Sequence, residues 1–284
     1  MFGSVAFHRV AAIIAATLVL GPDGRAQASW DVASGQAIAT HGRFQPIMNR
    51  IHCHCAVASS SLVQLRDRVF TMSREPTDWL QWHTPYHDPA SPLSRRLAIV
   101  QQQLKWALPP LLERPLRVIS ICAGQGNDVL GVLQTYPHAD RVHARLVELD
   151  ERNVHTALKQ VEALQLRGIE VKCGDAGRLA AYEGIAPADI VLICGVFGNI
   201  SEADIFRTID ALPQLCGRGA SVIWTRTRRA PDITPAIRRY FAEHAFVETA
   251  FDAPDEVEFS VGVHHFVGGP QSLQPDHRLF SFVV

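Results

Sequence analysis

Lysine is nearly absent from this sequence of 284 residues: Lys105, Lys159 and Lys172 are the only lysines, and arginine carries almost all of the positive charge. The formal net charge is −1, so the chain lacks the basic field that attracts nucleic acid or an anionic membrane surface. Hydrophobic residues make up 47% of the chain and charged residues 19%, which is typical of a globular protein rather than a disordered one. The composition therefore argues against a nucleic-acid or membrane partner.

The six cysteines have neither the spacing of a disulfide framework nor that of a zinc site. Cys122, Cys173 and Cys194 fall at the ends of predicted buried strands, where a free thiol behaves as a small hydrophobe. This scatter indicates a reducing compartment. The stretch His52-Cys53-His54-Cys55 lacks the spaced ligand pairs that a structural zinc site needs. We expect no metal site.

The apolar run from Val10 to Leu20 has 11 residues, too few to span a bilayer, which takes about 20. It follows Arg9 and precedes Ala26-Gln27-Ala28, an arrangement that resembles a secretory signal with its cleavage site. Residues 1–71 contain neither Lys nor Glu, and Met72 opens a more regular segment. A dispensable leader with a misassigned start, a genuine signal and a real domain are the alternatives for residues 1–71.

Residues 72–113 are predicted to form a helical cap in front of the main domain. Ser91-Pro92 has the pattern of a helix start, and Pro109-Pro110 has the pattern of a stop. Between them, apolar residues recur at spacings of three and four, as in an amphipathic helix. These residues are Leu93, Leu97, Val100, Leu104 and Leu108.

Residues 114–284 alternate between apolar strands and amphipathic helices, which predicts an α/β fold with a mostly parallel sheet covered on both faces. The last two strands have no helix between them, so they must pair antiparallel as a hairpin. Residues 278–284 are a candidate edge strand. The expected strands are 117–121, 144–148, 169–173, 189–194, 219–225, 246–251 and 258–266, and the expected helices are 128–135, 151–165, 202–214 and 233–243.

The turn after the first of these strands carries the strongest functional signal. The apolar run ends at Cys122, the small residues Ala123-Gly124-Gln125-Gly126 follow, and Asn127 and Asp128 are candidate caps of the next helix. Glycine lets the backbone approach a ligand closely, and a helix N-terminus offers free N–H groups and a positive dipole. This turn predicts a site for an anionic or nucleoside-bearing cofactor.

The next strand ends in an acidic residue suited to a ribose. Glu148 lies 22 residues after Gly126, where a carboxylate can accept hydrogen bonds from both ribose hydroxyls; Asp150 is the second choice. A dinucleotide fingerprint needs a third glycine, but Val129 stands at that position. The pattern therefore argues against a nicotinamide cofactor.

The strand order ending in a hairpin, with Val118–Gly126 as first motif, resembles the class I S-adenosylmethionine (SAM) methyltransferases, which have a Rossmann-like seven-stranded sheet. At the acidic position of that motif this chain has Ser120, and at its first glycine it has Cys122. Cys173–Ala176 resembles the loop after the third strand, where Asp175 would meet the adenine amine. Ile193–Asn199 resembles the motif that faces the methyl group and the substrate.

This resemblance implies SAM as the cofactor and a specific set of binding residues. The implied cofactor-binding residues are Cys122, Ala123, Gly124, Gly126, Glu148, Asp175, Ala176, Cys194 and Gly195. The segment from Trp79 to Leu97 also resembles an uncharacterised bacterial group of these enzymes.

The substrate side is less legible in the sequence. Asn199 and His83 are the candidate catalytic residues, and Trp82, Tyr86 and Phe197 are candidate substrate contacts. Each has a structural alternative: a helix cap for Asn199, a solvated turn for the histidine, and core packing for Phe197. His264 and His265 lie on opposite faces of the last strand, so at most one faces a pocket. The arginines at 226–229 fit a solvated loop better than an acidic-substrate site.

Together these features predict a SAM-dependent methyltransferase that acts on a small molecule, with no nucleic-acid or membrane partner. A cytoplasmic location follows from the supply of the cofactor, and export through the signal-like N-terminus is the alternative. Two other functions remain open. One is an NAD(P)-dependent oxidoreductase on the same kind of sheet, and the other is a non-catalytic SAM-binding scaffold, which the departures at Ser120 and Cys122 favour.

Overall fold

The computed structural model describes residues 29–31, 36–38 and 77–283. By its contacts the chain divides into two units, Met1–Ser73 and Arg74–Val284. In the first unit, β1 (Ser29–Asp31) pairs antiparallel with β2 (Gln36–Ile38). The signal-like run and the His52–Cys55 stretch lie outside the described residues. Among the helices that the structure describes, none is both long enough and apolar enough to cross a membrane.

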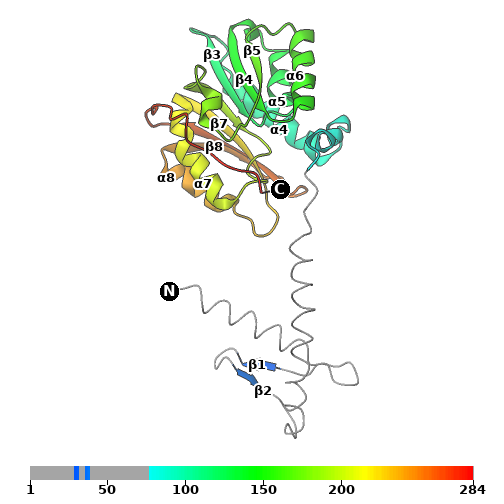
Figure 1. The fold of residues 1–284 in the computed structure, drawn as a ribbon, viewed down its shortest axis with the longest axis vertical. Helices are drawn as coiled ribbons and strands as arrows, with labels where there is room; N and C mark the ends of the chain where they lie inside the picture. Colours follow the sequence, from blue (N-terminus) through cyan, green and yellow to red (C-terminus); the bar gives the residue numbers. More distant parts are fainter. Residues whose placement is uncertain (1–28, 32–35, 39–76, 284) are drawn as a thin grey trace. The chain divides into compact units, whose positions relative to one another are not determined.

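The second unit is built on a seven-stranded sheet with the order β5-β4-β3-β6-β7-β9-β8 (Figure 1). The first five strands in this order run parallel, whereas β9 runs antiparallel to both β7 and β8. The Rossmann-like α/β sheet with an antiparallel hairpin at its end is therefore confirmed. The strands are β3 (Leu116–Ile121), β4 (Val142–Glu148), β5 (Ile169–Cys173), β6 (Ala188–Ile193), β7 (Cys216–Thr227), β8 (Phe246–Asp252) and β9 (Phe259–Phe266).

Helices cover both faces of this sheet, and neighbouring residues of β3 show why the strand is apolar throughout. Val118 packs in the cluster that holds α4 and α5, whereas Ile119 packs in the cluster that holds α7 and α8. Both side chains are at most 1% exposed, as expected for a parallel strand between two helical layers. Besides the short α3 (Trp79–Trp82), the helices are α4 (Pro92–Ala107), α5 (Asn127–Leu133), α6 (Glu151–Ala163), α7 (Glu202–Ala211) and α8 (Thr234–Glu243).

The helix after the glycine turn begins differently from the sequence expectation. Gly126, with φ of +75°, is the N-cap of α5, and Asn127 and Asp128 are its first two residues. A glycine occupies this left-handed conformation without the steric cost of a side chain. At α7 the N-cap is Ser201, which accepts a hydrogen bond from the Asp204 N–H at 3.1 Å.

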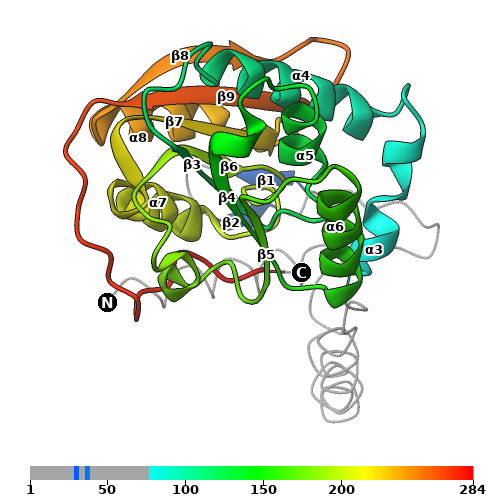
Figure 2. The ribbon, with the colours of Figure 1, turned by 90° about the horizontal axis from the view of Figure 1, so that it is seen from above.

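The C-terminal segment is not the edge strand that the sequence suggests. It leaves the sheet after β9 and runs back past α7 (Figure 2), making single bridges from Arg278 to Arg178 and from Phe282 to Ile200. The Leu279 N–H donates to the Gly177 carbonyl at 2.7 Å. This close approach requires the glycine, because a Cβ there would lie 2.5 Å from the Phe280 carbonyl oxygen.

The long helix α4 is anchored on the sheet by side chains from one of its faces. Val100 and Leu104 are buried against α5, and Gln101 donates through Nε2 to the Asn127 carbonyl at 2.8 Å. Gln103 donates to Asp252 at the end of β8 at 2.6 Å. The helix start is set by Ser91, which accepts a hydrogen bond from the Ser94 N–H, as predicted from Ser91-Pro92.

Candidate functional site

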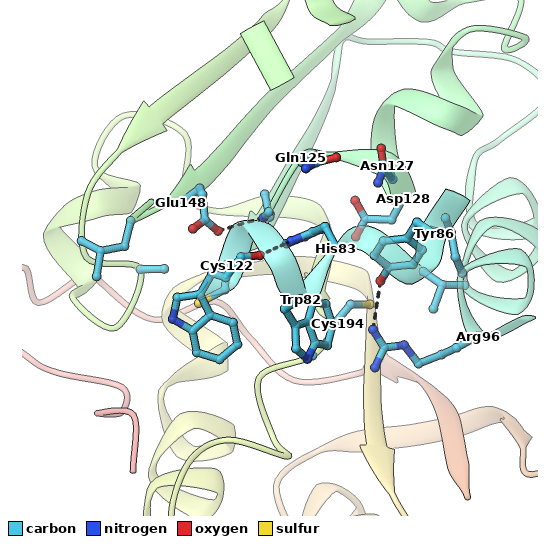
Figure 3. Close-up of a pocket in the computed structure, with 18 of the residues that line it drawn as sticks. Trp82, His83, Tyr86, Arg96, Cys122, Gln125, Asn127, Asp128, Glu148 and Cys194 are labelled. Carbon is cyan, nitrogen blue, oxygen red and sulfur yellow. Dashed lines mark hydrogen bonds between the residues drawn. The ribbon is translucent and has the colours of Figure 1, made fainter. Parts of the chain in front are cut away.

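A cavity of about 120 Å³ lies at the carboxyl ends of the central parallel strands (Figure 3). Its floor is the glycine turn after β3 and the ends of β4, β5 and β6, and its cover comes from α3, α4 and the C-terminal segment. In open parallel sheets, ligands bind at this edge. The lining residues are Trp79, Trp82, His83, Tyr86, Arg96, Leu97, Val100, Cys122, Ala123, Gly124, Gln125, Asn127, Asp128, Glu148, Leu149, Asp175, Ala176, Cys194, Gly195 and Phe282.

Glu148 connects the end of β4 to the glycine turn. Its Oε2 accepts a hydrogen bond from the Gly124 N–H at 2.9 Å, and its Oε1 accepts one from the Asp150 N–H at 2.9 Å. The side chain is 7% exposed. Each carboxylate oxygen has a further lone pair, so Glu148 shapes the turn and can still accept hydrogen bonds from a ligand in the cavity.

The cavity is covered by residues 78–88, which we call the lid. Asp78 accepts hydrogen bonds from the Leu80 and Gln81 N–H groups and thereby caps α3. The same carboxylate pairs with Arg152 at 2.7 Å, at the start of α6. The lid is therefore attached to the strand-end loop that follows Glu148.

His83 of the lid lies directly on the glycine turn. Its Nδ1 is 2.6 Å from the Trp79 carbonyl oxygen, so Nδ1 carries a proton and Nε2 is left facing the turn. A Cβ on Gly124, whose φ is +55°, would lie only 2.2 Å from this Nε2. The contact between lid and turn therefore depends on Gly124 having no side chain.

A polar group occupies the end of the cavity opposite Glu148 (Figure 3). Arg96 of α4 donates to the Tyr86 hydroxyl at 3.1 Å, and its guanidinium lies 5.5 Å from the centroid of the Trp82 ring. Burial raises the pKa of Tyr86, although Arg96 opposes the rise. Asp128 is 8% exposed, and burial raises its pKa to about 6.

Two cysteines line the cavity, but neither is an activated nucleophile. Burial raises the pKa of both the Cys122 and the Cys194 thiol, so both remain protonated at neutral pH. Cys173, expected at a buried strand end, is instead exposed, because β5 lies at the edge of the sheet. Within the described part of the chain, no cluster of His, Cys, Asp and Glu is arranged to hold a metal ion.

The C-terminal segment closes the side of the cavity that is next to the loop after β5. Asp175 accepts from Arg278 at 2.6 Å and from the Gly177 N–H at 2.9 Å, so its carboxylate is already held by protein donors. Phe282 lies against Trp79 of the lid, with ring centroids 5.5 Å apart. The last residues of the chain thus complete the wall of the site.

The structure brings together most of the residues that the sequence and the resemblance nominate. Gly126 is the exception among the nine expected cofactor contacts: a Cβ on it would meet Leu146 and Leu130 of the core rather than the cavity. The nominated residues that line the cavity are Cys122, Ala123, Gly124, Glu148, Asp175, Ala176, Cys194 and Gly195, with Trp82, His83 and Tyr86 in the lid.

Other nominated residues lie away from the cavity. Phe197 is fully buried and packs on Trp224, so it has the core position that was its alternative. Asn199 donates through Nδ2 to the Gly195 carbonyl at 2.7 Å and is absent from the lining. His264 is enclosed in the core, where its ring stacks on Phe241 at 4.3 Å, and His265 is exposed.

Nine residues that line the cavity are not among the nominated site residues, and four of these nine add charge or exposed apolar surface to it. Arg96 and Phe282 come from distant segments, and no local motif marks them. Asp128 has the pattern of a helix cap, and Leu149 that of an ordinary apolar residue, yet its 64% exposure at a strand end offers an uncovered apolar surface. The sequence signals for two of them are an arginine on the cap helix and an apolar residue directly after Glu148.

No family model matches this sequence, and no curated protein matches it. Solved structures do match. Two structures of magnesium protoporphyrin IX methyltransferase (ChlM) from Synechocystis PCC 6803, one with bound SAM and one with bound SAH, are each 14% identical to this chain. Each match covers 67% of this chain, and it covers 92% and 94% of the two ChlM chains. The TM-scores are 0.51 and 0.50. An O-methyltransferase family protein from Burkholderia thailandensis, 16% identical, has a TM-score of 0.48 and covers 76% of this chain and 71% of its own. The chain thus shares the Rossmann-like α/β fold of the two ChlM structures.

Proposed function

We propose that this protein transfers the methyl group of SAM to a small-molecule acceptor. The proposal rests chiefly on one observation, the hydrogen bond from the Gly124 N–H to the Glu148 carboxylate at the floor of the cavity. This hydrogen bond places a carboxylate and a glycine turn side by side at the carboxyl ends of the parallel strands, which is where such folds bind nucleoside cofactors. The fold shared with ChlM supports it.

The donors and surfaces of the cavity fit SAM. Glu148 has free lone pairs for the ribose hydroxyls, and Ala176 with the exposed side chain of Leu149 offers apolar surface for the adenine. Asp175 is the proposed partner of the adenine amine and would share its carboxylate with Arg278. When bound, SAM supplies a methyl group activated by its sulfonium.

The residues of the chain contribute position and exclusion of water rather than covalent chemistry. The lid aromatics Trp82 and Tyr86 face the cavity and form the proposed acceptor wall. His83, through its Nε2, is the proposed general base if the acceptor must lose a proton. The cavity of about 120 Å³ is smaller than the roughly 300 Å³ at which small-molecule sites begin. We therefore expect the lid to move outward when ligands enter.

Nothing in the cavity gives specific support to a nicotinamide cofactor. Val129, at the third glycine position of the dinucleotide fingerprint, is 1% exposed and packs in the core of α5. The small acceptor and the cytoplasmic location remain part of this proposal, because SAM is made and regenerated inside cells. The cap at 72–113 and the domain at 114–284 are proposed to work as one catalytic unit.

Calorimetric titration of the purified protein with SAM and S-adenosylhomocysteine tests the proposal. We expect micromolar-range binding of both and none of NADH. Glu148→Gln should weaken binding at least about tenfold, since hydrogen bonds to a charged group are each worth about 1.5–3 kcal/mol. Glu151→Gln is the matched control, because Glu151 is an exposed acid three residues further on.

A folded protein that fails to bind SAM at millimolar concentration would overturn the assignment, and so would equal binding by wild type and E148Q. Because Glu148 also holds the Gly124 and Asp150 N–H groups, thermal unfolding of E148Q must accompany the titration. Binding of SAM without release of S-adenosylhomocysteine across a broad acceptor panel would favour the scaffold function instead.

A further inference from the structure

The cavity contains two opposite charges that the proposed function has not used, Arg96 and Asp128. They stand where the first motif departs from the family pattern. Ser120, at the acidic position of that motif, is 1% exposed within β3 and is not a cavity-lining residue. If the amino group of a ligand is to be neutralised in this cavity, the acid that does so must come from a position other than 120.

Arg96 has hydrogen-bonding capacity that the protein leaves unused. A guanidinium carries five N–H donors in a planar fork that matches a carboxylate. One contact goes to the Tyr86 hydroxyl, and the plane rests near the ring of Trp82. Considering only the residues that the structure describes, no carboxylate forms an ion pair with Arg96. The same guanidinium borders Gly195, at the end of β6, where a Cβ would lie 3.9 Å from its nitrogen.

Asp128 is a buried acid without a direct ion pair, although the positive charge of Arg96 acts on it from a longer distance and favours its charged form. Its Oδ1 accepts a hydrogen bond from the adjacent Val129 N–H at 2.8 Å, and in residues 77–283 no Lys, Arg or His forms an ion pair with it. Burial of such a group is costly unless a partner neutralises it. It lies beside Tyr86 at the end of the cavity opposite Glu148 (Figure 3), so a ligand cation bound there would supply the missing partner.

We propose that Arg96, held in place by its hydrogen bond to Tyr86, binds the α-carboxylate, and Asp128 binds the α-ammonium, of the amino-acid part of SAM. The inference rests on the proposed function. It assigns to Asp128 the neutralisation of the ligand's ammonium, because Ser120 stands at the acidic position of the first motif. The two charges of an α-amino acid require an anion and a cation site close together, and this end of the cavity has both. With Glu148 at the other end, the cavity recognises a nucleoside joined to an amino acid. A nicotinamide carries neither α-group, and so would leave both Arg96 and Asp128 without a partner.

The test uses ligands that differ at the amino-acid end. S-adenosylhomocysteine has both charged groups of the amino acid, decarboxylated S-adenosylmethionine has the ammonium but no carboxylate and also carries a methyl sulfonium, and 5′-methylthioadenosine has neither charged group. Calorimetry on the full chain should show that Arg96→Gln and Asp128→Asn each weaken S-adenosylhomocysteine at least about tenfold. Neither variant should change the affinity for 5′-methylthioadenosine. Arg95→Gln, the exposed neighbour on α4, is the control and should bind all three ligands as the wild type does.

The decarboxylated ligand separates the two roles. D128N should weaken it, whereas R96Q should not, because the carboxylate that Arg96 contacts is missing. Loss of 5′-methylthioadenosine binding in R96Q or D128N would show that the residue has a merely structural role. Unchanged binding of S-adenosylhomocysteine would show that the residue does not contact the ligand. Either result overturns the inference. If the wild type binds none of the three ligands, the proposed function itself fails. If the wild type binds the three equally well, only the amino-acid assignment fails.

Discussion

Replacing Gly124 by alanine should separate the lid from the glycine turn, and the structure allows the cost to be divided into two parts. The first part is conformational: φ at Gly124 is +55°, a left-handed angle that costs a residue with a side chain about 1–2 kcal/mol. The second part is steric, because the new methyl group would lie 2.2 Å from His83 Nε2 and 2.8 Å from His83 Cε1. Overpacking of this kind costs about 1–3 kcal/mol.

The two parts can be measured separately with matched variants. Gly184 has φ of +83° with no atom within 4 Å of an added Cβ, so G184A reports the conformational cost alone. In the double variant G124A/H83A the steric conflict is gone and the conformational cost remains. A double-mutant cycle from urea unfolding should therefore give a coupling energy of about 1–3 kcal/mol between positions 124 and 83.

The reasoning fails if that coupling energy is below about 0.5 kcal/mol, the range found for independent sites. It also fails if G124A costs no more than G184A, because the lid would then not rest on the turn. Binding of S-adenosylhomocysteine gives an independent check. G124A should bind more weakly than the wild type, and G124A/H83A should regain part of the affinity.

Three further predictions concern the acid in the cavity, the C-terminal segment and the N-terminal unit. Burial raises the pKa of Asp128 to about 6 from 3.8, so the folded chain holds a proton that the unfolded chain has lost. The stability of the wild type should therefore fall relative to D128N, by up to about 3 kcal/mol, as the pH rises from about 4 to 6, and should stay lower above that. Urea unfolding at a series of pH values measures this, and a difference that does not change with pH would contradict it. The stability of the wild type must be compared with that of D128N because a second group also changes it. Burial lowers the pKa of His264 to about 4, so the stability of both proteins falls as the pH drops below 6.5. Phe282→Ala should remove the contact with Trp79 and speed hydrogen exchange of the lid amides while β3 and β6 stay protected; unchanged lid exchange would refute the role given to the C-terminal segment. A fragment of residues 72–284 should be soluble and bind S-adenosylhomocysteine like the full chain, and an insoluble fragment would show that residues 1–71 are needed.

The fold was accessible from the sequence because its signals are local. The two central strands β3 and β6 are six residues each and largely apolar, and each long helix repeats apolar residues with helical spacing. The absence of a helix between residues 252 and 258 dictates the antiparallel hairpin of β8 and β9. The strand-forming residues of the C-terminal segment, residues 278–284, predict an edge strand. The segment makes single bridges at two places instead of a continuous ladder.

About half of the candidate site can also be predicted from local signals in the sequence. The ends of parallel strands meet at one edge of the sheet, so residues that follow β3, β4, β5 and β6 in the sequence are brought together by the topology alone. Glu148 and Gly124 are 24 residues apart and joined by a hydrogen bond of 2.9 Å. The sequence pattern of Asp128 is that of a helix cap, but Gly126 fills the N-cap position with a left-handed φ of +75°.

The α/β sheet, the glycine turn and the acid that faces it follow from local patterns in the amino-acid sequence, because each strand, turn and helix is marked by neighbouring residues. The cover and the charged groups of the cavity depend on tertiary packing. Arg96 comes from the cap helix and Phe282 from the end of the chain, and both reach the site through packing between segments that are far apart in sequence. A contact of that kind leaves no local pattern, since its free energy depends on how whole elements dock rather than on the spacing of neighbouring residues.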